Sequence, residues 1–389
     1  MVEQDRCHDI NAWEQRPFGK VYTRCTEKNN PIRFGVDKII TVASMQYAPR
    51  HGCTNNEYLL TYNVMKLGDI AFEGNRNKRF PFGRFVENMI GEGIVSHVFS
   101  VYRPIVKQSS LLFLKYYINN DYVIRNMLRK STIAATMMRT LVDADLMRQT
   151  LTLPSGREQE KIGKLFVDID NLIDAEKRKL DLLQKKKTAL LRQIFERKLR
   201  FKGYDNPWNR HKLGSITDSY SGGTPPVSDS SYYGGDIPFI RSAEIANEST
   251  ELFITQSGLA ASSAKRVKKG DVLYALYGAN SGNASFAKLD GAINQAVLSI
   301  RAEKGFSNSF IMYWLQRSKN AIIGTFLQGG QGNLSGSIVK KLSIQTPRID
   351  EQERIGLFFI KIDSLITAET RKLDLLIDKK KALLQKMFV

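Results

Sequence analysis

Residues 154–195 read PSGREQEKIGKLFVDIDNLIDAEKRKLDLLQKKKTALLRQIF, and residues 347–388 read PRIDEQERIGLFFIKIDSLITAETRKLDLLIDKKKALLQKMF. The two stretches align without a gap at an offset of 193 residues (347 − 154), and 25 of the 42 aligned positions are identical. Chance does not produce this similarity, so the chain contains an internal duplication. The constant offset indicates that both copies do the same mechanical job.

Each copy has the pattern of one long helix. Apolar residues recur at helical spacing over residues 158–202, where Gly163 is the one helix breaker. A seven-residue series of apolar positions starts at Phe166 in the first copy and at Phe359 in the second. Such a heptad series is typical of helices that pack along a seam. We therefore expect two spacer helices, over 158–202 and 348–389, that form an antiparallel coiled coil.

Each heptad seam also carries one glutamate and one lysine. These are Glu176 and Lys187 in the first copy, and Glu369 and Lys380 in the second. Charges on a buried seam need partners of opposite sign. We predict the antiparallel register that pairs Glu176 with Lys380 and Lys187 with Glu369. The alternative is that these side chains extend along the seam and reach solvent.

The segments before the helices, residues 1–157 and 203–347, correspond more weakly. Their offset drifts from 195 at Trp13 and Trp208 to 202 at Gly68 and Gly270 (208 − 13 and 270 − 68). A drifting offset indicates a shared scaffold whose loops differ in length. In the second segment, strand-like runs lie at 271–277 and 296–300, and a helical pattern lies at 310–317. We expect an α+β protein with two mixed α/β domains of one fold that bind different targets.

The charge of the chain favours a polyanionic partner. Among 389 residues, 58 Lys and Arg face 39 Asp and Glu, which gives a net charge of +19 and a pI of 9.7. Nucleic acid is the first expectation and an anionic membrane surface the alternative. The sequence has no long apolar run and no secretory signal at residues 1–13, so we expect no membrane association and a cytoplasmic protein.

A coiled coil of about 30 paired residues would measure about 45 Å, longer than one turn of B-DNA.

No pattern of catalytic chemistry is present. The three cysteines and four histidines lack the spacing of a disulfide framework, a zinc site or a catalytic triad. The chain also lacks a Gly-x-x-x-x-Gly-Lys phosphate loop. A DNA methyltransferase needs an Asn/Asp-Pro-Pro-aromatic motif, but the adjacent prolines here, Pro225 and Pro226, lie in Gly-Thr-Pro-Pro-Val. We expect no catalytic residue, no metal and no cofactor in this chain.

Several short motifs resemble one known family. They read GGTP at 222–225, IPFIR at 237–241, KKGDVL at 268–273 and GAINQAV at 291–297, together with the Pro-x-x-x-Glu-Gln-x-x-Ile-Gly start of each long helix. In this combination the chain resembles the specificity subunits of type I restriction-modification enzymes over essentially its whole length. The first half follows the family pattern less closely, at 39–50 and 125–149.

The resemblance implies a specific division of labour. Two target-recognition domains each read one half of a split site in double-stranded DNA, while the spacer helices set the gap and dock two methyltransferase subunits. Restriction subunits join the full complex. S-adenosylmethionine, ATP and Mg are then expected on the partner subunits, and the chain itself is expected to be no enzyme.

Two other interpretations stay open at this point. A free-standing DNA-binding or architectural protein would work without enzyme partners, and a nuclease of unfamiliar type would cut DNA with a metal. Neither explains why the helices are duplicated more faithfully than the domains between them.

Candidate DNA contacts are loop residues with cationic, amide, hydroxyl or aromatic side chains, because phosphates are bound by Arg and Lys and base edges by polar side chains. In the first domain we predict Arg50, Arg76, Lys78, Arg79 and Arg84, a basic segment interleaved with Phe80 and Phe82. In the second domain we predict Tyr220, Thr224, Arg241, Lys265, Arg266, Tyr277, Gln328 and Gln331.

Overall fold

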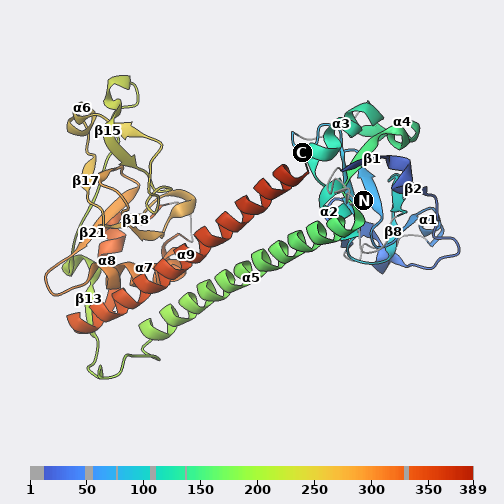
Figure 1. Ribbon diagram of the computed structural model, residues 1–389. Helices are drawn as coiled ribbons and strands as arrows, with labels where there is room; N and C mark the ends of the chain where they lie inside the picture. Colours follow the sequence, from blue (N-terminus) through green and yellow to red (C-terminus); the bar gives the residue numbers. More distant parts are fainter. Residues whose placement is uncertain are drawn as a thin grey trace, which may run out of the picture. The chain divides into compact units, whose positions relative to one another are not determined.

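The computed structural model describes residues 13–48, 56–75, 78–105, 111–135, 138–327 and 333–388. The chain divides into two compact units (Figure 1). Unit 1 comprises Met1–Lys177 with Lys372–Val389, and unit 2 comprises Arg178–Arg371. Each unit contains strands and helices, and both contain parts of the long helices α5 (Gly156–Phe195) and α9 (Ile349–Met387). The predicted α+β class is confirmed.

The globular part of unit 1 is built from short elements. The strands are β1 (Glu14–Pro17), β2 (Tyr22–Cys25), β3 (Ile40–Thr41), β4 (Gln46–Tyr47), β5 (Asn63–Met65), β6 (Ile70–Glu73), β7 (Arg84–Glu87), β8 (Gly93–Val95), β9 (Val101–Pro104), β10 (Thr132–Ala134), β11 (Arg139–Leu141) and β12 (Thr150–Leu153). The helices are α1 (Asn56–Leu59), α2 (Leu111–Ile118), α3 (Asp121–Ser131) and α4 (Asp143–Arg148).

Unit 2 has a matching set of elements. The strands are β13 (Asn209–Lys212), β14 (Thr217–Ser221), β15 (Tyr233–Ile240), β16 (Phe253–Ile254), β17 (Lys265–Val267), β18 (Val272–Ala275), β19 (Ala284–Phe286), β20 (Gly291–Ile293), β21 (Val297–Ala302) and β22 (Ser343–Thr346). The helices are α6 (Gln256–Ala260), α7 (Asn308–Phe326) and α8 (Gly336–Lys341).

The two units share one sheet topology. Unit 1 has a four-stranded antiparallel sheet in the order β2-β9-β6-β7, and unit 2 has the same arrangement as β14-β21-β18-β19. A terminal ribbon also recurs, as β1 with β12 and as β13 with β22. A parallel pairing joins β15 to β20 in unit 2, and the parallel bridge between Ile39 and Ile94 takes its place in unit 1. The drifting sequence offset therefore reflects a shared fold.

A turn before the central strand of each sheet shows how the sequence enforces this fold. Gly68 and Gly270 have φ of 84° and 93°, a left-handed conformation that favours glycine. The next residue closes the turn: Asp69 Oδ2 accepts a 2.8 Å bond from the Lys66 backbone N–H, and Asp271 makes the same bond in unit 2.

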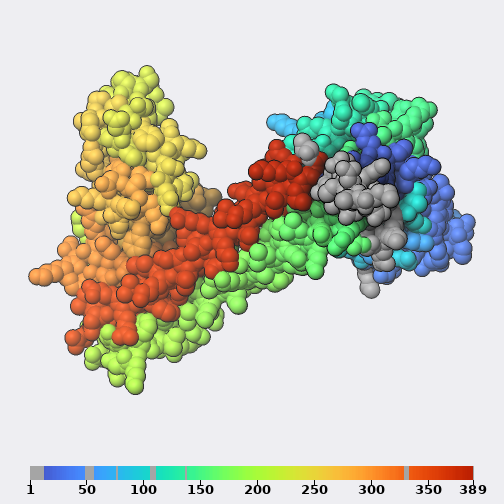
Figure 2. Space-filling model, in the orientation of Figure 1, coloured from blue at the N-terminus to red at the C-terminus, as the bar shows by residue number. Residues whose placement is uncertain are grey.

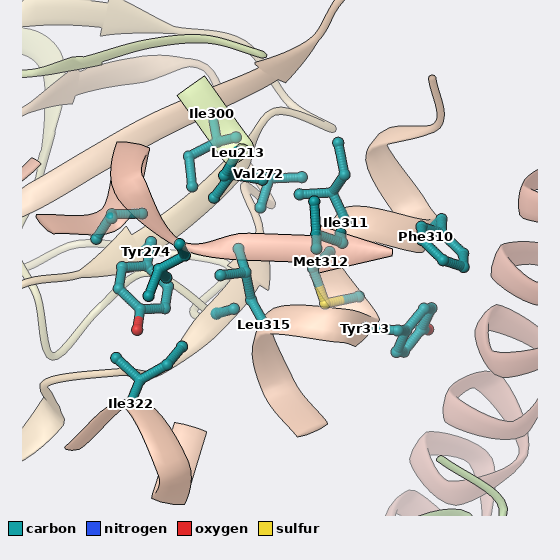
Figure 3. Close-up of a cluster of buried hydrophobic side chains, with 14 of the residues drawn as sticks. Leu213, Val272, Tyr274, Ile300, Phe310, Ile311, Met312, Tyr313, Leu315 and Ile322 are labelled. Carbon is teal, nitrogen blue, oxygen red and sulfur yellow. The ribbon is translucent and has the colours of Figure 1, made fainter. Parts of the chain in front are cut away.

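The core of unit 2 lies between its antiparallel sheet and α7. In Figure 3, Val272 and Ile300 from the sheet lie on one side of the cluster, and Phe310 and Tyr313 of α7 lie on the side of α9. Phe310 is fully buried. Unit 1 repeats this packing with Phe113 of α2 in place of Phe310.

The helices that pack on the long helices differ between units. The 19-residue α7 of unit 2 is continuous, whereas unit 1 breaks the chain into α2 and α3. Asn120 caps α3, because its side chain accepts a 3.0 Å bond from the Tyr122 backbone N–H. Its amide also donates to the Leu384 carbonyl of α9 at 2.9 Å. This bond holds the junction between α2 and α3 against α9.

The first long helix ends earlier than predicted. The sequence pattern predicts a helix that continues to residue 202, but α5 stops at Phe195. Arg197 takes a left-handed φ of 60°, and the Lys198 backbone N–H bonds back to the Gln193 carbonyl at 2.9 Å. This is the cap that usually recruits glycine, built here on arginine. None of the helices in the described ranges has the length and apolar character needed to cross a membrane.

The antiparallel packing of the long helices is present in each unit, but the predicted register is wrong. In unit 1, Lys380 contacts Asp170 and Lys372 contacts Glu176. Relative to the expected pairing of Glu176 with Lys380, one helix is shifted along the other by six to eight residues (176 − 170 and 380 − 372). This shift is about one heptad.

Unit 2 shows the same shift. Lys187 contacts Asp363 at 2.6 Å, and Lys179 contacts Glu369 at 2.7 Å, in place of the predicted pairing of Lys187 with Glu369. The physical reason is that Asp170 and Asp363, which flank the seam, are the acidic partners of the seam lysines. In this register all four charged seam residues are paired.

Candidate nucleic-acid interface

Four loops of unit 2 meet at one end of its antiparallel sheet. Ser221, the last residue of β14, pairs with Leu298, and Ala275, the last residue of β18, pairs with Val297. The Leu276 carbonyl then accepts a 2.9 Å bond from the Leu334 backbone N–H. We call the resulting surface the loop end of unit 2; it consists of residues 222–224, 275–278, 294–296 and 333–334.

Thr224 lies at the centre of this loop end. Its hydroxyl donates a 2.5 Å hydrogen bond to Gln295 Oε1, and both side chains are exposed. The two preceding glycines make this approach possible, because a Cβ on Gly222 would lie 1.7 Å from the Ile293 carbonyl oxygen and one on Gly223 2.6 Å from Ser263 Cβ. Thr224 and Gln295 therefore present a hydroxyl and an amide on a rigid backbone, the groups that read base edges.

Tyr277 lies at the same loop end. The residue follows β18, is 36% exposed and forms an isolated β-bridge with Asn333. The Asn333 side chain also accepts a bond of 3.4 Å from the Gly278 backbone N–H. Gln328 and Gln331, predicted as DNA contacts, lie outside the described residues.

Tyr220, Lys265 and Arg266 form a second group beside this end. The Tyr220 hydroxyl donates to the Arg266 carbonyl at 2.9 Å, and the Arg301 guanidinium lies 5.6 Å from the Tyr220 ring centroid. Lys265 is exposed on β17, where it pairs with Ile293 of β20. The structure thus brings five of the predicted residues, Tyr220, Thr224, Lys265, Arg266 and Tyr277, to one region of unit 2.

Arg241 differs from these residues because its charge is already balanced. Its guanidinium bonds to Glu244 at 2.9 Å and to Glu251 at 2.5 Å. The hydrogen bonds that Arg241 donates to Glu244 and Glu251 raise its pKa above the ordinary value. This side chain holds its own loop together, and its role as a DNA contact stays a prediction.

In unit 1 the predicted residues lie on the corresponding loop. Lys78, Arg79 and Arg84 follow β6, as Tyr277 follows β18. Arg84 bonds to Glu73 at 2.6 Å and to the Ala43 carbonyl at 2.9 Å, so it has a structural role. Arg79 and Arg84 both lie over the Phe80 ring, at 5.0 and 5.1 Å from its centroid. Lys78 is exposed, whereas Arg50 and Arg76 lie outside the described residues.

Arginines that were not among the predicted contacts also come to this loop, from later in the chain. Arg139 lies 5.1 Å from the centroid of Phe82 and donates to the Pro81 carbonyl at 3.3 Å. Arg125 and Arg129 of α3 line a cavity of about 340 Å³ together with Phe82 and Tyr122. The alternation of basic and apolar residues in Asp121–Ser131 was the signal that could have identified a basic helix face.

We call residues 74–75, 78–84 and 138–139 the loop end of unit 1, and it is equivalent in structure to the loop end of unit 2. The bridge between Asn75 and Met138 in unit 1 matches the bridge between Tyr277 and Asn333 in unit 2. Their side chains differ completely, since arginine and phenylalanine dominate one end and threonine, glutamine and tyrosine the other. Two ends of one fold therefore present different chemistry. Within the described residues, no group of three His, Cys, Asp or Glu side chains could hold a metal ion.

Comparisons with known proteins agree with this architecture. Residues 205–376 match the family described as the type I restriction modification DNA specificity domain. The MjaX type I restriction enzyme specificity subunit of Methanocaldococcus jannaschii is 25% identical over 272 residues, which cover 64% of this chain and 59% of that protein. The MjaIX specificity subunit of the same organism is 26% identical over 177 residues, 43% of this chain and 41% of that protein. The chain thus matches less than two thirds of the length of these relatives.

Solved structures share the fold along the whole chain. A chain from a structure of a type I R-M system has a TM-score of 0.60 at 19% identity and covers 98% of this chain and 99% of its own. The HsdS subunit from Thermoanaerobacter tengcongensis has a TM-score of 0.53 at 19% identity, with 98% of both chains covered. The type I S subunit from M. genitalium has a TM-score of 0.61 at 12% identity and covers 100% and 98%. The chain thus contains a region similar to the type I restriction modification DNA specificity domain, and it shares the fold of type I S subunits.

Proposed function

We propose that this chain is the non-catalytic DNA-recognition subunit of a cytoplasmic type I restriction-modification complex and reads a bipartite target in double-stranded DNA. Unit 1 reads one half of the target and unit 2 reads the other. One observation carries the proposal: the same fold occurs twice, with different side chains at the equivalent loop ends. A pair of domains that read the same bases would have no reason to diverge there.

Each loop end carries side chains suited to binding DNA. Thr224, Gln295 and Tyr277 supply hydroxyl, amide and aromatic groups for base edges. Lys265 and Arg266 lie beside them and supply positive charge for phosphates. In unit 1 the surface around Phe80 and Phe82 is richer in arginine, so we expect it to draw more of its affinity from the DNA backbone.

The long helices are proposed to dock two copies of one partner, the methyltransferase subunit. Leucines that are identical in both copies of the repeat are exposed: Leu172 and Leu365 by 44% and 55%, and Leu182 and Leu375 by 65% and 54%. Exposed apolar residues normally scatter singly, and a recurrent pair marks an interaction surface.

In the observed register, each unit brings together one leucine of the Leu172/Leu365 pair and one leucine of the Leu182/Leu375 pair. In unit 1, Leu172 lies one turn before Glu176, which contacts Lys372, and Leu375 lies one turn after that lysine. In unit 2, Leu365 and Leu182 occupy the same positions around Glu369 and Lys179. Two matched apolar surfaces fit two copies of one partner.

The chemistry of the complex is then assigned to other chains. We propose that S-adenosylmethionine is bound by the methyltransferase subunits, and that ATP and Mg are bound by the restriction subunits. This chain supplies target choice and geometry, and its target sequence follows from the shape of the two loop ends.

Co-purification tests the proposal. The tagged chain, expressed with the methyltransferase of its own cell, should recover two copies of that enzyme. Leu172→Glu and Leu365→Glu should each reduce the recovery to one copy, and the double variant should recover none. Leu199→Glu is the matched control, because Leu199 is 43% exposed but lies beyond the end of α5.

Methylome sequencing of a strain that lacks the gene completes the test. Loss of a split methylated motif supports the proposal. A chain that purifies alone and leaves every methylated motif unchanged would instead favour a free-standing DNA-binding protein.

A further inference from the structure

Unit 2 contains a groove of about 1040 Å³ between α5, α7 and α9. Its walls carry five cationic side chains and two acidic ones, an excess of three positive charges (5 − 2). The cations are Lys185, Lys187, Arg192, Arg317 and Lys319, and the acids are Asp181 and Asp363.

Three of the five cations keep charge available for a ligand. The Arg192 side chain is exposed and makes no ion pair or hydrogen bond with the residues the structure describes. Lys319 donates to a neutral partner, Asn283 Oδ1, at 2.6 Å. Lys185 pairs with Asp181 at 2.8 Å, but its side chain is 73% exposed and such surface pairs are weak.

The other two cations serve the fold. Lys187 is held by Asp363 at 2.6 Å, and Arg317 contacts Glu196 at 3.1 Å. Glu196 is therefore one more acidic group beside the groove, and it faces Arg317.

The groove leads to the loop end of unit 2. Gln316 and Lys319 also line an adjoining cavity of about 320 Å³, whose other wall includes Gly282 and Asn283. These two residues belong to the connection from β18 to β19, which begins at Leu276 and includes Tyr277. A strand of DNA bound at the loop end can therefore continue along one lined path to α5.

Four of the five cations of the groove occur in one copy of the repeat, and the fifth, Lys187, is kept as Lys380. At the offset of 193, Lys185 corresponds to Asp378 and Arg192 to Gln385. Tyr313 and Tyr116 match at an offset of 197 (313 − 116), which aligns Lys319 with Tyr122 and Arg317 with Asn120. The two copies of the repeat are otherwise similar, but at these four positions the other copy has a neutral or acidic residue.

A feature found in both copies suits a partner that binds twice, whereas a feature of one copy suits a ligand that differs between the two halves. DNA is such a ligand, because each unit meets a different half-site. The groove thus differs in kind from the matched leucine surfaces.

We propose that this groove binds the phosphodiester backbone of the DNA strand that leaves the loop end of unit 2. The inference rests on the proposed DNA-binding function and adds a contact that carries no sequence information. Phosphate contacts of this kind release counterions, so they add affinity that falls steeply with salt and is equal for all sequences.

The test exchanges groove residues for those of the other repeat copy. The variant Lys185→Asp/Arg192→Gln places residues that α9 tolerates at the equivalent positions, and both wild-type side chains are exposed. The complex of this chain with its methyltransferase is titrated against two fluorescent duplexes, one with the motif found by methylome sequencing and one with that motif scrambled. The titrations are repeated over a range of salt concentrations.

We expect about tenfold weaker binding to both duplexes at physiological salt, with the slope of log affinity against log salt reduced by about two. The control variant Lys340→Gln/Lys341→Gln removes two exposed lysines of α8 that do not line the groove. Unchanged affinity and slope, an equal loss in the control, or a loss confined to the motif duplex would overturn the inference. If the wild-type complex itself binds neither duplex, the proposed function fails before the groove is tested.

Discussion

Tyr116 donates a 2.6 Å hydrogen bond to Asp170, and this bond ties the globular part of unit 1 to its long helices. Lys380 of the opposite helix contacts the same aspartate and lies 5.3 Å from the Tyr116 ring centroid. Unit 2 repeats the arrangement: Tyr313 bonds to Asp363 at 2.8 Å, and Lys187 lies 5.3 Å from the Tyr313 ring. The tyrosine, aspartate and lysine form one junction that occurs twice.

Removal of the tyrosine hydroxyl should weaken each junction. Tyr116→Phe and Tyr313→Phe should each lower the free energy of unfolding by about 1–2 kcal/mol, because each takes a hydrogen bond away from a charged group. Urea titration measures the change. Tyr122→Phe is the control, since Tyr122 is 60% exposed, and it should change stability little. Equal stability of Tyr313→Phe and the wild-type chain would contradict the junction.

The ion pair of the junction should be energetically coupled. Lys187 and Asp363 have side chains 17% and 37% exposed, so a double-mutant cycle with Lys187→Met and Asp363→Asn should give a coupling of about 1 kcal/mol. The cycle for Lys185 and Asp181, exposed by 73% and 59%, should give a coupling near zero. Equal couplings in the two cycles would show that burial does not strengthen the pair.

Two glycines at equivalent positions allow α2 and α7 to approach the long helices. A Cβ on Gly163 would lie 2.7 Å from the Phe113 backbone nitrogen, and one on Gly356 would lie 1.8 Å from the Ser309 hydroxyl oxygen and 2.6 Å from Ser309 Cβ. Gly163→Ala and Gly356→Ala should therefore each lower the free energy of unfolding by about 2 kcal/mol. Gly156→Ala is the control, because nothing lies within 4 Å of its Cβ. Thermal unfolding in which either variant is as stable as Gly156→Ala would contradict the close packing at that glycine.

Glu87 should make unit 1 sensitive to pH. The carboxyl is 4% exposed, neither oxygen has a hydrogen-bond partner in the described part of the chain, and burial raises the pKa of Glu87 from 4.5 to about 9. The folded chain then keeps this proton up to about pH 9, while the unfolded chain releases it above about pH 4.5. Stability should therefore fall as pH rises through this window.

Glu87→Gln removes the titration and should be more stable than the wild-type chain by about 1–3 kcal/mol at pH 8, but by little near pH 4.5. Urea titrations of both chains across this range measure the difference. The equivalent position in unit 2 is Phe286, which shows that the fold does not need a carboxyl there. A stability difference that stays constant with pH would contradict the raised pKa of Glu87.

The sequence identified the architecture because the duplication is visible in it. Matching helices, a shared α+β fold and antiparallel packing all follow from two copies of one pattern. The register did not follow, because Asp170 and Asp363 flank the seam and are oriented by Tyr116 and Tyr313, which come from helices far away in the sequence. The end of α5 was placed too late because Arg197 takes a conformation that sequence patterns assign to glycine.

The candidate site was predictable in part for a similar reason. Residues next to a recognisable turn, such as Thr224, and residues at a strand end, such as Tyr277, lie where loops meet. The sequence does not show whether an arginine already has an acidic partner in the fold. Arg84, for example, is paired with Glu73 of the neighbouring strand. Arg139 reaches Phe82 from a distant hairpin, so only the folded chain brings them together.

The most direct test of the central claim is the methylome of cells that carry the variant Thr224→Ala/Gln295→Ala in place of the wild-type chain. The two substitutions remove exposed groups from the loop end of unit 2 and leave unit 1 and the long helices unchanged. We predict that one half of the split motif becomes degenerate while the other half and the gap stay as they are. Equal relaxation of both halves, or a motif that is indifferent to the variant, would contradict the claim that each unit reads its own half of the target.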